Sequence, residues 1–225
     1  MARKDLCEEK VIASIISIME RTSIRIGNDG YEKLYGSYGL TTLKDSHVKV
    51  NGSDVHFCFK GKKGISHKIT LKNKKLARII QHCRDIPGKE LFQYYDAEGN
   101  VKDIDSGMVN RYIKDGTGGE FTAKDFRTWS GTLNALRAFQ SLGQAESDTA
   151  AKKNVQAALD EVSEKLGNTR TVCKKYYVHP GIIRMYEEQN LHSYLNELDR
   201  IEAPDHLSGL TSEERVLMKI LKELV

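Results

Sequence analysis

The chain has 225 residues, of which 39% are hydrophobic and 29% are charged, and its formal net charge is +4. This length allows one large domain or two small ones, and the composition is ordinary for a globular protein. No internal repeat, low-complexity tract or apolar run of about eighteen residues is present, which excludes a membrane-spanning protein. Met1 leads into ARKDLCEEK and not into a signal peptide, so we expect a soluble protein that is not exported.

The cysteines are scattered, at Cys7, Cys58, Cys83 and Cys173. No pair has CxxC spacing, and no cysteine has histidines at zinc-site spacing, so we expect neither a disulfide framework nor a zinc site. This usage is typical of a reducing, intracellular compartment, and we therefore expect a cytoplasmic protein, associated with the nucleoid if bacterial.

The charge is unevenly distributed. Residues 1–145 hold 24 Lys and Arg against 17 Asp and Glu, a net charge of +7, whereas residues 146–225 have a net charge of −3. Within the first part, residues 44–78 carry ten Lys and Arg against only Asp45 and Asp54. Such a patch is typical of a surface that binds phosphate backbones, although a solvated lysine-rich surface has the same composition.

The first predicted element is an amphipathic helix that begins near Glu8 and ends at Gly27, because EEKVIASIISIMERTSIRIG has apolar residues at helical spacing. On this prediction Arg25 lies in the last turn of the helix. Residues 40–72 form the predicted sheet region, where HVKV and VHFCF alternate around Asn51-Gly52.

A third strand, ISHKITL, follows a second turn that is built on Gly61 and Gly64 and carries Lys60, Lys62 and Lys63. We therefore predict a three-stranded antiparallel sheet near the N-terminus. The rest, residues 73–225, is predicted to be helical, so the fold class is mainly α with one small sheet.

Helices are predicted from their period and their caps in the segments 72–83, 105–116, 122–143, 147–168, 180–198 and 210–224. Asp105 or Ser106 caps the second of these. Capping-box patterns begin two others, with Thr122 and Asp125 in one and Thr211 and Glu214 in the other. Gly167-Asn168 is a typical helix end, and the pair Tyr176-Tyr177 follows it.

Four features invite a common chemical explanation: Arg25, Lys62, Arg127 in KDFRTW, and the tyrosine pair. Taken singly, each has an ordinary structural explanation, such as charge complementing a helix dipole or a tyrosine packing with its tip exposed. Together they are what a metal-free attack on a phosphodiester requires. Guanidiniums hold the non-bridging oxygens, a lysine protonates the leaving alkoxide, and a phenol forms a covalent phosphotyrosine.

The sequence resembles the type IB DNA topoisomerases of the poxvirus and bacterial branch. The matching motifs occur in the family's order across roughly residues 8–190: IRIGN, GLTTLKDSHV, KGKKGISH, LFQY, TAKDFRTWSGT and LGNTRTVCKKYYVHP. The resemblance implies the catalytic fold that these topoisomerases share with tyrosine recombinases. It also implies relaxation of supercoiled DNA by single-strand cleavage through a 3′-phosphotyrosyl intermediate, strand swivelling and religation, without ATP.

By position, the resemblance implies that Arg25 and Arg127 are the catalytic arginines and that Lys62 is the general acid. Asn168 falls where relatives have a histidine or asparagine that hydrogen-bonds the scissile phosphate. The family's nucleophile lies nine residues further, which implies Tyr177, whereas Tyr176 packs or touches DNA. Tyr31 and Lys124 resemble DNA-contacting residues of the family.

Further basic side chains are predicted to contact DNA: Lys60, Lys63, His67 and Lys174. His179 has no catalytic role in the family pattern, and we interpret Cys173 as a packing residue. No metal or nucleotide cofactor is expected, and Mg²⁺ would at most stimulate product release. The expected partner is duplex DNA, bound by a monomer and without a membrane.

Two departures from the family pattern matter. Arg170 replaces the usual proline after Thr169, which would loosen the turn but leaves the nine-residue spacing intact. The family's smaller N-terminal DNA-clamping domain is absent from this sequence, so we interpret residues 1–225 as a catalytic domain, with residues 1–9 as a residual interdomain linker. Such a chain would retain the cleavage chemistry and bind DNA less tightly.

Two alternatives remain. A tyrosine recombinase or integrase shares the catalytic fold, but usually has His-x-x-Arg where this chain has Lys124-Asp-Phe-Arg127, and His at the position of Asn168. A non-catalytic DNA-binding module would use the basic residues for phosphate contacts only. That module explains the charge but not the spacing between Asn168 and Tyr177.

Overall fold

The computed structural model describes residues 6–201 and 209–224, and divides into two compact units, Met1–Phe126 (unit 1) and Arg127–Val225 (unit 2). Five residues of the predicted linker, 1–5, lie outside the described residues. Leu6 is buried in the core of unit 1, and the first helix begins at Glu8. The prediction of a mainly helical chain with a three-stranded antiparallel sheet near its start is confirmed.

The first helix of unit 1, α1 (Glu8–Thr22), buries Val11, Ile15 and Met19, as its period predicts. The prediction that it continues to Gly27 is wrong. Ser23 takes the left-handed conformation (φ 55°), and its N–H bonds the Met19 carbonyl at 2.8 Å, which closes the helix four residues early. The β-branched Ile24 and Ile26 disfavour helix here, and residues 23–28 form neither a helix nor a strand.

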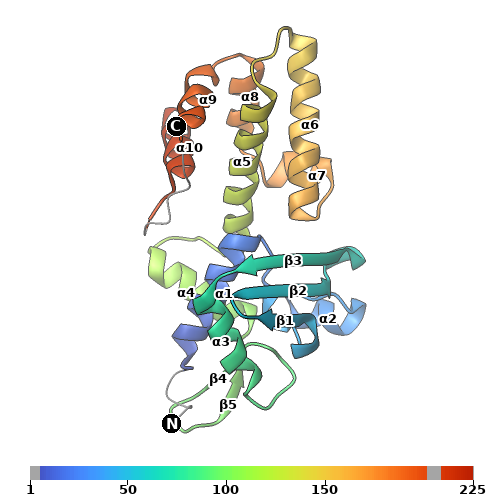
Figure 1. Ribbon diagram of the computed structural model, residues 1–225, viewed down its shortest axis with the longest axis vertical. Helices are drawn as coiled ribbons and strands as arrows, with labels where there is room; N and C mark the ends of the chain where they lie inside the picture. The colour runs from blue at the N-terminus through green and yellow to red at the C-terminus, as the bar shows by residue number, and fades with distance from the viewer. Residues whose placement is uncertain (1–5, 202–208, 225) are drawn as a thin grey trace. The chain divides into compact units, whose positions relative to one another are not determined.

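The predicted sheet is present, with the antiparallel order β1 (Val48–Asn51), β2 (Asp54–Lys60) and β3 (Ser66–Lys72) (Figure 1). Val55, Phe57 and Phe59 alternate inward along β2 and are buried. Gly52, at φ 59°, makes the first turn. The second turn is a short 3₁₀ segment, Lys62–Gly64, so the sheet ends in an exposed basic turn.

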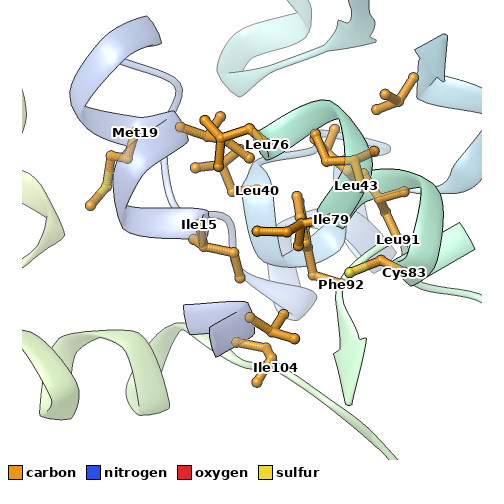
Figure 2. Close-up of a cluster of buried hydrophobic side chains, with 14 of the residues drawn as sticks. Ile15, Met19, Leu40, Leu43, Leu76, Ile79, Cys83, Leu91, Phe92 and Ile104 are labelled. Carbon is orange, nitrogen blue, oxygen red and sulfur yellow. The ribbon is translucent and has the colours of Figure 1, made fainter. Parts of the chain in front are cut away.

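Unit 1 also contains α3 and α4, which were predicted, and α2 and a two-stranded sheet, which were not. The bounds are α2 (Asp29–Tyr35), α3 (Lys74–Arg84), β4 (Gln93–Tyr95), β5 (Val101–Asp103) and α4 (Ser106–Thr117), with 3₁₀ turns at Leu40–Thr42 and Asp45–His47. Of the two residues considered for the α4 cap, Asp105 is the one that accepts from the Met108 N–H. Figure 2 shows the core of this unit, where Ile15, Leu40, Ile79 and Phe92 pack together.

Unit 2 is built from helices. Their bounds are α5 (Ala123–Leu142, which begins in the last residues of unit 1), α6 (Asp148–Leu166), α7 (Arg170–Tyr176), α8 (Pro180–Glu187), α9 (His192–Asp199) and α10 (Ser212–Glu223). The single helix predicted over 180–198 is two, because Gln189 adopts a left-handed φ of 61° between them. Among the described residues, no helix is long and apolar enough to cross a membrane.

Candidate active site

The segment that leads to the predicted nucleophile begins at Gly167. This glycine closes α6 in the left-handed conformation (φ 58°), as the Gly-Asn pattern predicts, and Asn168 donates its N–H to the Ser163 carbonyl. Thr169 then caps α7, a helix that sequence analysis missed. One short helix, α7, therefore connects Asn168 to Tyr177, nine residues later, and fixes the distance between these two residues.

Arg170, where the family pattern has proline, pairs with a side chain of the preceding helix. It occupies the first position of α7, where its side chain makes a two-point ion pair with Asp160 of α6. The two N–O distances are 2.6 and 2.5 Å. This pair joins the start of α7 to α6 in place of a stiff proline ring.

Arg127 and Tyr177 come together in unit 2. The Arg127 side chain is only 4% exposed, and its Nη2 donates to the Leu166 carbonyl at 2.8 Å. Its guanidinium carbon lies 5.0 Å from the centroid of the half-buried Tyr177 ring, a cation–π distance. Arg127 therefore contacts the last residue of α6, two residues before Asn168, and the ring of Tyr177.

The backbone of Tyr177 packs directly on α5. A Cβ at Gly131 would overlap the Tyr177 carbonyl oxygen and lie 3.1 Å from its carbonyl carbon. The Thr132 hydroxyl lies 3.4 Å from the same oxygen and accepts the His179 N–H at 3.1 Å. Sequence analysis missed Gly131 and Thr132, and the only signal for them was a glycine inside a helical pattern.

We expect Gly131→Ala to destabilise the chain by about 1–3 kcal/mol, because the new methyl group must push the Tyr177 backbone away from α5. Chemical denaturation measures this loss. The matched control is Gly116→Ala in α4, where a Cβ meets nothing within 4 Å. That variant should gain about 0.5–1 kcal/mol from reduced backbone entropy. Equal stabilities for the two variants would contradict the close approach.

Arg25 belongs to unit 1 and lies in the irregular segment after α1, not in its last turn. The Arg25 carbonyl accepts the Leu40 N–H at 2.9 Å, and the side chain is half-buried. Two glycines allow this pairing, since a Cβ on Gly39 would lie 2.5 Å from the Gly27 Cα and 2.6 Å from the Arg25 carbonyl oxygen. Gly27 itself has φ 105°, a conformation that favours glycine.

Lys62 is exposed on the turn between β2 and β3, where its Nζ lies 5.7 Å from the ring centroid of Tyr31 on α2. The Asn28 side chain caps α2 by accepting the Tyr31 N–H, which places this ring. Behind the turn, the His67 ring stacks on Phe59 at 5.1 Å, and a Cβ on Gly61 would lie 2.6 Å from that ring. His67 therefore supports the turn that presents Lys62.

The other predicted contacts are on the surface, where Lys60, Lys63, Lys124 and Lys174 are exposed. Tyr176 is 48% exposed, whereas Cys173 is buried, as the packing interpretation expects. His179 caps α8 by accepting the Gly181 N–H on its Nδ1, a structural role. Within residues 6–201 and 209–224, no three His, Cys, Asp or Glu side chains gather as a metal site would require.

Comparisons with known proteins point to one family. The family model described as eukaryotic DNA topoisomerase I, catalytic core, matches residues 1–202. DNA topoisomerase 1B of Acanthamoeba polyphaga mimivirus is 30% identical over 187 residues, which cover 80% of this chain and 56% of the relative. DNA topoisomerase 1B of vaccinia virus and DNA topoisomerase I of monkeypox virus are each 25% identical over 171 residues, which cover 74% of this chain and 51% of the relative. The chain thus spans about half the length of the curated relatives it matches.

Proposed function

Because the chain belongs to the type IB DNA topoisomerase family, we propose that it relaxes supercoiled duplex DNA by cutting and resealing one strand through a covalent bond to Tyr177. The observation that carries the assignment of the nucleophile is the packing of the buried Arg127 guanidinium against the ring of Tyr177. A guanidinium beside the nucleophile can bind the non-bridging oxygens of the attacked phosphate and neutralise the charge that builds on them. Tyr176, which is exposed on the same turn, has its ring beside Lys175.

In the proposed mechanism, Arg25 and Arg127 bind the non-bridging oxygens of one phosphate, and Asn168 adds a hydrogen bond. The Tyr177 oxygen loses its proton to solvent and attacks the phosphorus, and the bond from phosphorus to the 5′-oxygen breaks. Lys62 donates a proton to the departing 5′-oxygen. The free 5′-hydroxyl swivels and later attacks the phosphotyrosine, which restores the strand and releases the tyrosine without ATP.

The basic side chains of unit 1 support duplex DNA as the substrate. Lys60, Lys62 and Lys63 surround one exposed turn, and the Tyr31 ring lies beside it. Ammonium groups bind the phosphate backbone irrespective of sequence, so affinity should fall steeply as salt rises. We propose that the chain acts as a monomer. We also propose that the reaction needs no metal, because two guanidiniums and an ammonium supply the positive charge that phosphoryl chemistry requires.

The test is relaxation of a supercoiled plasmid at low salt, in EDTA and without ATP. We expect relaxed topoisomers and a protein–DNA adduct on a denaturing gel. Recombination between paired sites by an oligomer, in place of relaxation of any plasmid, would identify a tyrosine recombinase. DNA binding with neither relaxation nor adduct would identify a non-catalytic DNA-binding module and refute the proposal.

A further inference from the structure

The C-terminal helix α10 contacts the elements that hold Tyr177, although it lies beyond the residues 1–202 that the family model matches. Its inner face is part of the unit 2 core, where Val216, Leu217 and Ile220 are buried. Trp129 and Tyr177 pack against the same core. Two specific contacts extend from this region to the neighbourhood of the tyrosine, one through Glu214 of α10 and one through Leu224, the residue that follows the helix.

The first contact joins α10 to the helix that carries Arg127. The Trp129 indole N–H donates to Glu214 Oε1 at 2.7 Å, and Glu214 Oε2 accepts the Thr211 N–H at 2.8 Å. Burial raises the pKa of Glu214, but the hydrogen bonds from Thr211 and Trp129 outweigh it, and the pKa lies below its usual value. The ionised carboxylate therefore binds α10 to α5 at a residue midway between Arg127 and Gly131.

The second contact joins α10 to the segment that follows the tyrosine. The Leu224 side chain fills the space over Gly181, where a Cβ would overlap Leu224 Cδ1. Gly181 lies in the first turn of α8 and donates its N–H to the His179 side chain, while the His179 N–H bonds Thr132 of α5. The segment after Tyr177 is therefore held to α5 through His179, and Leu224 packs on the start of α8 directly after it.

We propose that α10 positions Tyr177 for strand cleavage, with Glu214 acting through Trp129 and Leu224 acting through Gly181. The proposal rests on the proposed function, because it assigns α10 a role in the same reaction. Glu214, Trp129 and Leu224 are positioning residues and not catalytic ones. Their effect is to keep the Tyr177 backbone against Gly131 and its ring against Arg127, and small displacements of a reacting group lower reaction rates strongly.

The test compares the rate of adduct formation on supercoiled plasmid, at saturating protein, for the wild-type chain, Trp129→Phe and Leu224→Ala. Trp129→Phe removes the indole N–H and keeps an aromatic ring. The matched control is Glu213→Gln, which weakens the ion pair between α10 and Arg137, ten residues beyond Arg127 on α5. DNA affinity is measured separately by anisotropy of a labelled duplex.

We expect Trp129→Phe and Leu224→Ala to form the adduct at least about tenfold more slowly than wild type, with DNA affinity unchanged. Glu213→Gln should keep the wild-type rate. Wild-type rates in all variants, or an equal loss in all three, would overturn the positioning role while leaving the proposed function intact. A wild-type chain that forms no adduct would instead refute the proposed function itself.

A second readout does not depend on activity. Trp129 is the only tryptophan of the chain, so its fluorescence reports on the contact with Glu214 directly. We expect Glu214→Gln to shift the emission, because the indole N–H loses an ionised acceptor. An unchanged emission spectrum would show that the contact is not made in solution, and would overturn the proposal.

Discussion

Tyr177→Phe is expected to abolish both plasmid relaxation and the covalent protein–DNA adduct. The change removes one oxygen, the proposed nucleophile, and keeps the ring that packs on Arg127. Since no large group is lost, the free energy of unfolding should stay within about 0.5 kcal/mol of wild type. A thermal melt and a denaturing gel measure the two effects.

The neighbouring tyrosine provides a matched control. Tyr176→Phe removes the same oxygen from an exposed ring one residue earlier, at the end of α7. We expect this variant to form the adduct at close to the wild-type rate. Loss of the adduct in Tyr176→Phe and its retention in Tyr177→Phe would reverse the assignment of the nucleophile.

Arg127→Lys is expected to slow cleavage by about 10²–10³, the loss typical of removing a preorganised group that stabilises charge in the transition state. The ammonium keeps the positive charge but has no planar fork, so it cannot bind two phosphate oxygens side by side or reproduce the guanidinium contacts with the Leu166 carbonyl and the Tyr177 ring. Single-turnover adduct formation at saturating protein measures the rate.

The control for this variant is Arg137→Lys on the same helix. Arg137 pairs with Glu213 and is far more exposed than Arg127, so its replacement should leave cleavage unchanged. If Arg127→Lys cleaves DNA within about threefold of wild type, a difference well below the loss expected for such a group, the role assigned to the guanidinium is wrong.

The elements that could be predicted from sequence are those with a strong local signal. The glycine end of α6, the hairpin at Asn51-Gly52 and the capping box of α10 depend on residues a few positions apart, and all three are present. The assignment of Tyr177, nine residues after Asn168, came instead from the family resemblance. The seven-residue helix α7 that separates them was missed because it is too short to show a period.

Other features depend on residues far apart in the chain, which a local pattern does not reveal. Gly39 permits the approach of the segment with Arg25, and Gly131 permits that of Tyr177. The hydrogen bond between Trp129 and Glu214 spans 85 residues. The wrong prediction for the end of α1 has a different cause. Ser23 closes the helix before Gly27, the residue that the pattern indicates as its end. Left-handed serine is uncommon, so glycine was the stronger local signal.

The central claim is that Tyr177 forms the covalent bond to DNA, and mapping the attachment site tests it most directly. The wild-type chain is incubated with supercoiled plasmid in EDTA and trapped with detergent. The DNA is then digested, and the peptide that retains a nucleotide is identified by mass spectrometry. We predict a nucleotide joined through its 3′-phosphate to Tyr177, and attachment to Tyr176, to any other residue or to none would contradict the account.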